Sequence, residues 1–335
     1  MQTLRTWART TALVAAGLVA SFASTVFAAD VTFRLEAHTV ASVTLNRAQL
    51  LGGTTEGATP VTLAGLLQLP FVEAARMPAV LMLHGDAGAI ANQVVWAEEL
   101  NAMGIAVFTL DSFTARGAIA TGASLMTMPF IMGGASRVVD AERALALLAK
   151  HPRIDPARIA VMGFSSGGRT ALTAAQTRFA SPFGTPGLGF AAYVALYPDC
   201  NVRLRDDDKV LRGPIRIFIG EADVVTAAAP CAAWAARIRA AGGDATTITF
   251  PGAYHGFDNV SSRGLIRVPG VPMTSRCNFE ETASGALVNV DTGKPPSDGD
   301  ACVSKGLIAG YDAAADSATK AAVKALLAET FGLQR

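Results

Sequence analysis

The sequence predicts an α/β fold in which helices cover both faces of a mostly parallel, doubly wound sheet. Two observations support this prediction. From Ala79 onward, short apolar stretches typical of buried strands alternate with stretches of helical character. One of these strands then runs through a glycine-rich corner directly into an alanine-rich helix, over residues 158–180. Ligands bind such sheets at the carboxyl ends of the strands, so the residues after each strand are the candidates for function.

The N-terminal 28 residues are expected to be a secretion signal that is removed from the mature protein. Arg5 and Arg9 precede an apolar run over 12–20, and the small residue Ala28 stands where cleavage is expected. The apolar run is too short to cross a bilayer of about 30 Å. We therefore expect residues 29–335 to form a single α/β domain that is periplasmic or secreted and has no membrane span.

The charge of the mature chain argues against a nucleic-acid partner. The full sequence has 28 Lys and Arg and 27 Asp and Glu residues, so removal of Arg5 and Arg9 leaves 26 basic and 27 acidic side chains. The charges nearly balance and the sequence has no cluster of basic residues, so binding to a polyanion is not favoured. No feature of the sequence sets an oligomeric state, and a monomer is the default expectation.

The predicted elements follow from apolar pattern and β-branched content. Residues 31–40 and 61–69 are expected to open the fold as an antiparallel pair. Parallel strands are expected at 79–83, 105–110, 158–163, 190–197, 215–220 and 245–250, and helices near 91–103, 135–150, 166–180, 226–241 and 312–331. Residues 260–303 are rich in Gly, Pro, Ser and Asp and lack periodicity, which indicates an insertion without regular structure.

Four cysteines remain after removal of the signal, namely Cys200, Cys231, Cys277 and Cys302. An even number in an exported chain favours two disulfides, for which the sequence allows three pairings. We favour Cys200 with Cys231 and Cys277 with Cys302, because the second bond would staple the insertion at 260–303. Zinc is the alternative, but no C-x-x-C or Cys/His spacing supports a metal site.

The strand-to-helix corner contains Gly163-Phe164-Ser165-Ser166-Gly167, which fits the G-x-S-x-G pattern of the nucleophile elbow in α/β-hydrolases. In that motif a sharp turn lifts the serine hydroxyl clear of the sheet. Strand and helix approach so closely there that a Cβ at position 163 or 167 would collide. The helix begins under Ser165, so its free N–H groups face any negative charge formed at that point. A merely structural glycine-rich turn is the alternative interpretation.

A serine nucleophile needs a base that accepts its proton and an acid that orients this base. In α/β-hydrolases the nucleophile comes first along the chain, then the acid, then the base, and His255 is the one histidine that follows Ser165. The base is therefore expected to be His255. Two of the other histidines, His38 and His151, are expected to be structural or surface residues.

The acid is expected to leave the end of a strand between the nucleophile and the base. Asp223 follows the predicted strand at 215–220 and is the favoured residue, with Glu221 and Asp199 as alternatives. A carboxylate in this position can also serve only as a helix cap.

Two backbone N–H groups are expected to hold an oxyanion. One belongs to Ser166, at the start of the helix, and the other to Asp86, in the glycine-rich loop that follows the predicted strand at 79–83. A glycine-rich turn with a hydrogen-bonded histidine, His84, is the alternative for this loop.

Five segments together resemble the dienelactone hydrolase family over about 60–260 and the final helix. They are His84-Gly85-Asp86-Ala87-Gly88, Asp111-Ser112-Phe113-Thr114-Ala115-Arg116-Gly117, Gly163-Phe164-Ser165-Ser166-Gly167-Gly168, Gly220-Glu221-Ala222-Asp223 and Pro251-Gly252-Ala253-Tyr254-His255-Gly256-Phe257. The resemblance implies that Ser165, Asp223 and His255 take the positions of the catalytic triad.

The sequence also departs from that family. Founding members use a cysteine nucleophile and a glutamate in the first loop, where this chain has a serine and Gly85, so an ordinary serine hydrolase is implied. Members that bind an anionic lactone have arginines near the site. Arg116 is similar to one of them, whereas Asn259 stands where a second would be. Contacts with substrate are expected from Arg116, Phe164 and His84.

Together these residues predict a hydrolase that cleaves a small-molecule carboxylic ester or lactone through an acyl-enzyme, with no metal or organic cofactor. A peptidase or an acyltransferase on the same fold is the nearest enzymatic alternative. A binding protein that keeps the fold without turnover is the alternative from another class. The complete set of Ser, Asp and His in the required order argues against it.

Overall fold

The computed structural model describes residues 33–72, 75–88, 91–117, 137–262 and 264–333. The predicted secretion signal lies outside the described residues. Every element described below belongs to one compact unit, Thr32–Arg335. None of the described helices combines the length and the apolar character that crossing a membrane requires.

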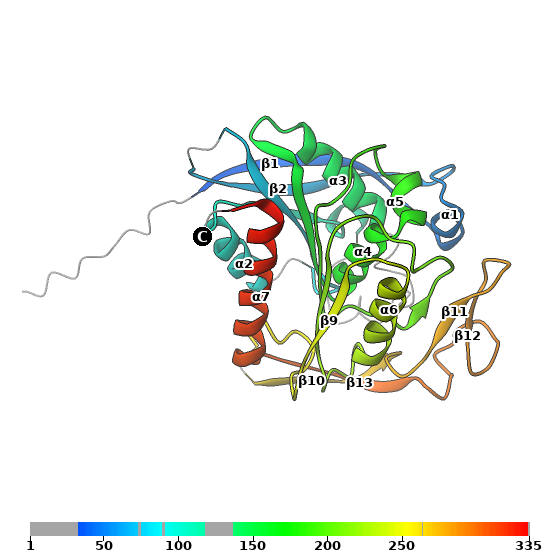
Figure 1. The fold of residues 1–335 in the computed structure, drawn as a ribbon. Coiled ribbons are helices and arrows are strands. Elements are labelled where there is room, and N and C mark those ends of the chain that lie inside the picture. Colours follow the sequence, from blue (N-terminus) through cyan, green and yellow to red (C-terminus); the bar gives the residue numbers. More distant parts are fainter. Residues whose placement is uncertain (1–32, 73–74, 89–90, 118–136, 263, 334–335) are drawn as a thin grey trace, which may run out of the picture. The chain divides into compact units, whose positions relative to one another are not determined.

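Within the described residues, a central sheet of eight strands has the order β1-β2-β4-β3-β5-β6-β8-β9 (Figure 1). β1 pairs with β2, and β2 with β4, in antiparallel fashion, and every pairing from β4 to β9 is parallel. The sheet is therefore mostly parallel, as the sequence predicts, with the antiparallel pair at one edge. The strands are β1 (Phe33–Thr44), β2 (Thr59–Pro70), β3 (Met77–Leu83), β4 (Ala106–Asp111), β5 (Ile154–Phe164), β6 (Tyr193–Leu196), β8 (Ile215–Gly220) and β9 (Ala245–Phe250).

The burial of the strands explains their different sequence patterns. All residues of β3 and of β6 are buried, because inner parallel strands are covered on both faces, and both read as continuous apolar runs. In β2, by contrast, Leu63, Leu67 and Leu69 are buried, whereas Thr62, Ala64 and Leu66, on the other face of the strand, are exposed. One face of β2 therefore faces the core and the other faces solvent.

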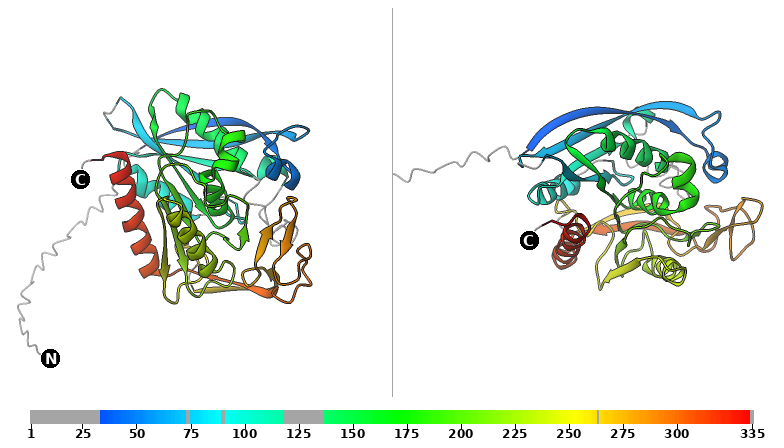
Figure 2. Two further views of the ribbon diagram at one scale, coloured as in Figure 1. Left: turned by 45° about the vertical axis from the view of Figure 1, so that its right-hand side comes forward. Right: turned by 45° about the horizontal axis from the view of Figure 1, so that its top comes forward.

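Helices cover both faces of the sheet (Figures 1 and 2). On one face α2 and α7 lie side by side, and Lys324 of α7 donates a hydrogen bond to Glu99 of α2 at 2.7 Å. On the other face α3, α4 and α5 pack against one another. The helices are α1 (Arg47–Gly52), α2 (Ala91–Asn101), α3 (Val138–Lys150), α4 (Ser166–Ala175), α5 (Thr177–Phe183), α6 (Ala228–Ala240) and α7 (Ala313–Phe331), and a 3₁₀ turn, η1, spans Thr114–Arg116.

The single helix expected over 166–180 is two helices, because the chain leaves the helical conformation at Gln176. This residue has an extended backbone, with φ −80° and ψ 123°, and forms a bridge with Val210. The backbone N–H of Thr177 donates to the carbonyl of Lys209 rather than to a helical partner. A tertiary contact with a distant segment thus ends α4, and local helix propensity gives no sign of it.

The insertion at 260–303 contains regular structure, so the expectation that it would be irregular was wrong. β10 (Leu265–Met273) pairs with β13 (Ser304–Gly310) in an antiparallel ribbon, and β11 (Phe279–Glu281) pairs with β12 (Leu287–Asn289) and with β7 (Val202–Arg203). Most residues of β10 are exposed or half-buried, and its pairing shifts register between Val268 and Pro272. The apolar alternation that would mark a strand is therefore absent from its sequence.

Two disulfides join the cysteines in the favoured pairing, Cys200 with Cys231 and Cys277 with Cys302. The first ties the segment after β6 to α6. The second closes a loop with a sequence separation of 25 residues across the insertion. Constraining a loop of this length stabilises the fold by about 3 to 4 kcal/mol in the chain-entropy model.

Candidate active site

The elbow at the end of β5 depends on close contact between backbones. A Cβ at Gly163 would lie 2.0 Å from the carbonyl oxygen of Gly167, and a Cβ at Gly167 would lie 2.2 Å from that of Leu83. Neither position tolerates a side chain. Between these glycines, Ser165 has φ 53°, which is rare for a residue with a Cβ and indicates a strained turn. The turn presents the Ser165 hydroxyl above the first residue of α4.

Three side chains that follow three different strands of the sheet meet at this point. The hydroxyl of Ser165 lies 2.9 Å from Nε2 of His255, and Nδ1 of His255 lies 2.8 Å from Oδ2 of Asp223. These partners assign the ring proton to Nδ1, so Nε2 is free to accept the hydroxyl proton. The three residues predicted from chain order are thus brought into one hydrogen-bonded chain.

The carboxylate of Asp223 is held by the turn in which it stands. It accepts hydrogen bonds from the backbone N–H groups of Val225 and Thr226, at 2.8 and 2.9 Å, and from the Thr226 hydroxyl at 2.8 Å. It caps this turn and contacts His255 at the same time. Of the alternative acids, Glu221 is exposed and bonds Thr249, and Asp199 lies beside Arg169.

A second polar network connects the two segments that carry the predicted oxyanion donors. The Ser166 hydroxyl donates to the Asp86 carboxylate at 2.6 Å. Because Ser166 is the first residue of α4, its backbone N–H has no acceptor inside the helix. The loop of Asp86 approaches closely, since a Cβ on Gly85 would lie 3.1 Å from Cβ of Ser165.

Arg137, which directly precedes α3, is hydrogen-bonded to the same network. Its Nη2 donates to the Ser166 hydroxyl at 2.9 Å, its Nη1 donates to the His84 carbonyl at 3.1 Å, and its guanidinium lies 5.0 Å from the Phe113 ring centroid. The side chain is buried and, among the described residues, forms no ion pair with a carboxylate. No sequence pattern identifies Arg137, because a lone arginine before a helix has many ordinary uses.

The matched sequence pattern of the dienelactone hydrolase family extends over residues 63–330. The chain belongs to the dienelactone hydrolase family. Membership makes the protein a hydrolase of carboxylic esters. The match contains the elbow, the acid turn and the loop of His255, so the family pattern and the geometry of the site concern the same residues.

Solved structures agree with this family at the level of the fold. The dienelactone hydrolase-like promiscuous phosphotriesterase P91 from metagenomic libraries is 19% identical, with a TM-score of 0.59, and the alignment covers 89% of this chain and 99% of that one. A candidate dienelactone hydrolase from Klebsiella pneumoniae subsp. pneumoniae is 13% identical, with a TM-score of 0.55 and coverage of 88% and 99%. No curated protein sequence matches the chain.

Two of the three residues expected to contact substrate are hydrogen-bonded to other groups of the protein. Arg116 forms a two-point ion pair with the buried Asp140, both contacts at 2.8 Å, and also bonds the Val43 carbonyl. His84 is buried, with Nδ1 2.7 Å from the Gly85 carbonyl and Nε2 accepting the Ser112 N–H. Neither residue lines the cavity at the triad, whereas Phe164 does.

The imidazole of His255 rests on a buried polar cluster that the sequence does not reveal. Its ring packs edge-on against Tyr197, with centroids 4.7 Å apart. The Tyr197 hydroxyl donates to Asp258 at 2.7 Å, and Trp96 Nε1 donates to the same carboxylate at 2.8 Å. The cluster packs against the ring of His255, and Tyr197 itself also lines the cavity.

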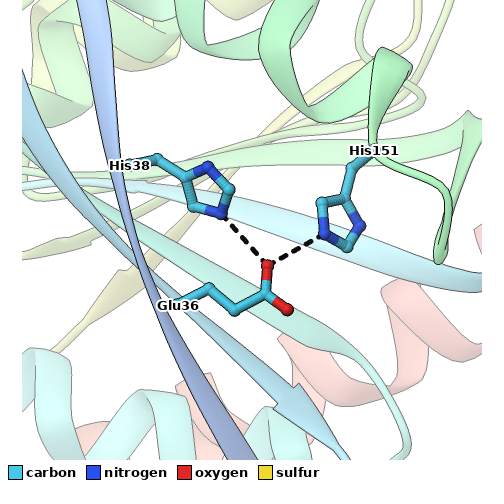
Figure 3. A group of neighbouring side chains, drawn as sticks. All are labelled: Glu36, His38 and His151. Atoms are coloured by element: carbon cyan, nitrogen blue, oxygen red, sulfur yellow. Dashed lines mark hydrogen bonds and ion pairs between the residues drawn. The ribbon is translucent and has the colours of Figure 1, made fainter.

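Glu36, His38 and His151 form the one group among the described residues with the spacing of a metal site (Figure 3). Both rings point at the same oxygen of Glu36, with Nε2 atoms 3.3 and 3.1 Å from it. The N–H of Arg153 donates to Nδ1 of His151, so the ring proton of His151 is on Nε2, where an ion would bind. Arg34 also pairs with Glu36. The group fastens β1 to the end of α3, in agreement with the structural role expected for both histidines.

We predict that His84 makes the fold sensitive to acid. Burial, and next the charge of Arg137, lower the pKa of His84 to about 4. The folded chain therefore keeps this ring neutral while the unfolded chain binds a proton below its usual pKa of about 6.5. The free energy of unfolding should fall by roughly 3 kcal/mol between pH 6.5 and 4 from this group alone.

Urea unfolding of wild type and His84→Gln at pH 7.0, 5.5 and 4.5 measures this effect. As the pH falls, the free energy of unfolding should decrease more for wild type than for His84→Gln. Parallel curves for the two proteins across this range would show that His84 does not carry the effect.

We also predict that Arg137 acts through position rather than substrate binding. Arg137→Lys keeps the charge but can reach only one of the two acceptors, and Arg137→Met removes both bonds. With p-nitrophenyl acetate, kcat should fall by about 10-fold in Arg137→Lys and 100-fold or more in Arg137→Met, with little change in KM. Arg178→Lys, at a buried ion pair with Glu281, is the matched control. A folded Arg137→Met protein with wild-type kcat would contradict the prediction.

Proposed function

We propose that the protein cleaves a small-molecule carboxylic ester or lactone through an acyl-enzyme formed on Ser165. The observation that carries the proposal is the continuous chain of hydrogen bonds from Ser165 through His255 to Asp223, at 2.9 and 2.8 Å. Such a chain is what a serine hydroxyl needs to become a nucleophile at neutral pH.

In the proposed mechanism, the Ser165 oxygen attacks the carbonyl carbon as Nε2 of His255 takes the hydroxyl proton. Asp223 stabilises the imidazolium that results. The negative charge on the former carbonyl oxygen faces the N–H groups of Ser166 and Asp86. His255 then gives its proton to the leaving alcohol oxygen, which leaves the acyl group on Ser165. A water molecule activated by His255 releases the acid.

The polar network behind these donors supports the oxyanion assignment. The Ser166 hydroxyl links α4 to the Asp86 loop at 2.6 Å, and Arg137 bonds that hydroxyl at 2.9 Å. Donors held in advance need no reorganisation when charge develops, and removal of one such donor typically lowers kcat by about 10² to 10³-fold. No bound metal or organic cofactor is part of the proposed chemistry.

We predict that Ser165→Ala abolishes hydrolysis of p-nitrophenyl butyrate. The rate should fall by about 10³-fold or more, because the acyl-enzyme cannot form. Ser284→Ala, on an exposed turn of the insertion, is the matched control and should keep the wild-type rate. Equal rates for wild type and Ser165→Ala would reject the assignment. A wild type that binds esters without turnover would favour a binding protein, and turnover of amides or acyl transfer to alcohols would favour the enzymatic alternatives.

We further propose that residues 1–28 are a secretion signal and that the mature chain, a single α/β domain from Ala29, is periplasmic or secreted. Support comes from the two disulfides, which form in oxidising compartments. After expression of the full chain in a Gram-negative host, N-terminal sequencing of the periplasmic or secreted fraction should begin at Ala29. Protein that stays in the cytoplasm with Met1 intact would contradict the proposal.

A further inference from the structure

The hydroxyl of Ser165 opens into a cavity of about 300 Å³, and one wall of this cavity is apolar. The β10–β13 ribbon supplies Ile266, Val268, Leu307 and Ala309 to it, and Phe164 lies beside the nucleophile. Apolar side chains held at a cavity wall favour a substrate group that can leave water. The volume is at the lower end of the range for small-molecule sites, so the group that fits is small.

The charged groups on the cavity lining are mostly acidic. Asp86 and Asp199 both line the cavity, and among its described lining residues there is no lysine or arginine. His255 is the one residue of that lining that can become cationic, and it is engaged with Ser165 and Asp223. A substrate carboxylate in this space would therefore meet two like charges and no basic partner from the described lining.

Three arginines on the segments around the site are committed to other groups. Arg116 is paired with the buried Asp140, and Arg137 bonds the Ser166 hydroxyl and the His84 carbonyl. Arg169 donates to the backbone carbonyls of Asp199 and Val202. Redirecting any of these side chains to a substrate would break buried hydrogen bonds, which is costly.

Asp199 is only loosely paired with a basic group. Its nearest cation is Nη1 of Arg169, 3.7 Å from Oδ2, which is beyond the length of a hydrogen bond. Burial raises the pKa of Asp199 above its usual range, Arg169 opposes this shift, and repulsion by Asp86 adds to it. The side chain is 28% exposed, so its charge reaches the space that a substrate would fill.

We propose that this site takes an uncharged ester whose apolar part packs against the β10–β13 ribbon, and that Asp199 is a specificity-determining residue which disfavours substrates carrying a carboxylate. This inference rests on the proposed function, because the same cavity must receive the scissile ester. It concerns which esters are cleaved, whereas the proposed function concerns how they are cleaved.

The test compares two esters of equal chain length, p-nitrophenyl hexanoate and the mono-p-nitrophenyl ester of adipic acid, at pH 7.5 with the uncatalysed rates subtracted. For wild type, kcat/KM for hexanoate should exceed that for adipate by at least 30-fold. In Asp199→Asn, the ratio of kcat/KM for the adipate ester to kcat/KM for the hexanoate ester should rise about 10-fold. Asp298→Asn removes an exposed carboxylate of the insertion and should leave the ratio unchanged.

A second comparison examines the apolar wall. Leu307→Asn should lower the ratio of kcat/KM for hexanoate to that for acetate by about 5-fold or more, because the longer acyl chain loses its apolar contact. Circular dichroism of each variant verifies that it is folded.

The outcomes separate the two proposals. Equal wild-type kcat/KM for hexanoate and adipate, or an adipate-to-hexanoate ratio that Asp199→Asn leaves unmoved, would overturn the specificity proposal while leaving the hydrolase mechanism intact. Absence of wild-type hydrolysis for acetate, hexanoate and adipate alike would overturn the proposed function itself. Should Asp199→Asn fail to fold, the wild-type ratio still decides whether carboxylates are disfavoured.

Discussion

The arrangement of the site depends on one steric constraint, the contact between bare backbones at the strand-to-helix corner. Gly163 and Gly167 leave no room for a Cβ, with clashes of 2.0 to 2.2 Å against carbonyl oxygens. This contact draws α4 against β5 and the end of β3, and it holds Ser165 at φ 53° with its hydroxyl exposed to the cavity. Next to this corner, the Ser166 hydroxyl at the start of α4 bonds Asp86 at 2.6 Å, and Gly85 of the same loop lies close to Ser165. A looser corner would separate Ser165 from the N–H groups proposed to stabilise an oxyanion.

The β10–β13 ribbon contacts both the cavity at Ser165 and the loop that carries His255. Its inner residues form the apolar wall of the cavity, and the N–H of Gly310 in β13 donates to the carbonyl of His255 at 3.0 Å. The ribbon therefore holds the loop of His255 while it also lines the pocket. The bond between Cys277 and Cys302 limits the freedom of the insertion that leads into this ribbon. A chain of this kind can change its pocket through the insertion without moving the elbow, which belongs to the central sheet.

The parts of the fold that could be predicted are those with a local physical signature. Inner parallel strands are buried on both faces, so they are recognisable as apolar runs. The order of nucleophile, acid and base along the chain points to Ser165, Asp223 and His255, which the structure joins by hydrogen bonds. Features set by distant contacts could not be predicted. The end of α4 at Gln176 depends on a bridge to Val210, the strands of the insertion are too exposed to show alternation, and Arg137 has no pattern. Arg116 shows a limit of family resemblance. A matching sequence position does not reveal that the Arg116 guanidinium is already ion-paired with Asp140.

The central claim, that Ser165 is the nucleophile activated by His255, can be tested by labelling the folded protein with a fluorophosphonate and locating the adduct. Trypsin releases residues 159–169 as one peptide, and fragment ions distinguish Ser165 from its neighbour Ser166. The account predicts a stoichiometric adduct on Ser165 in wild type and a much slower reaction in His255→Ala. An ester-hydrolysing protein that is labelled at another residue, or labelled equally fast without His255, would contradict it.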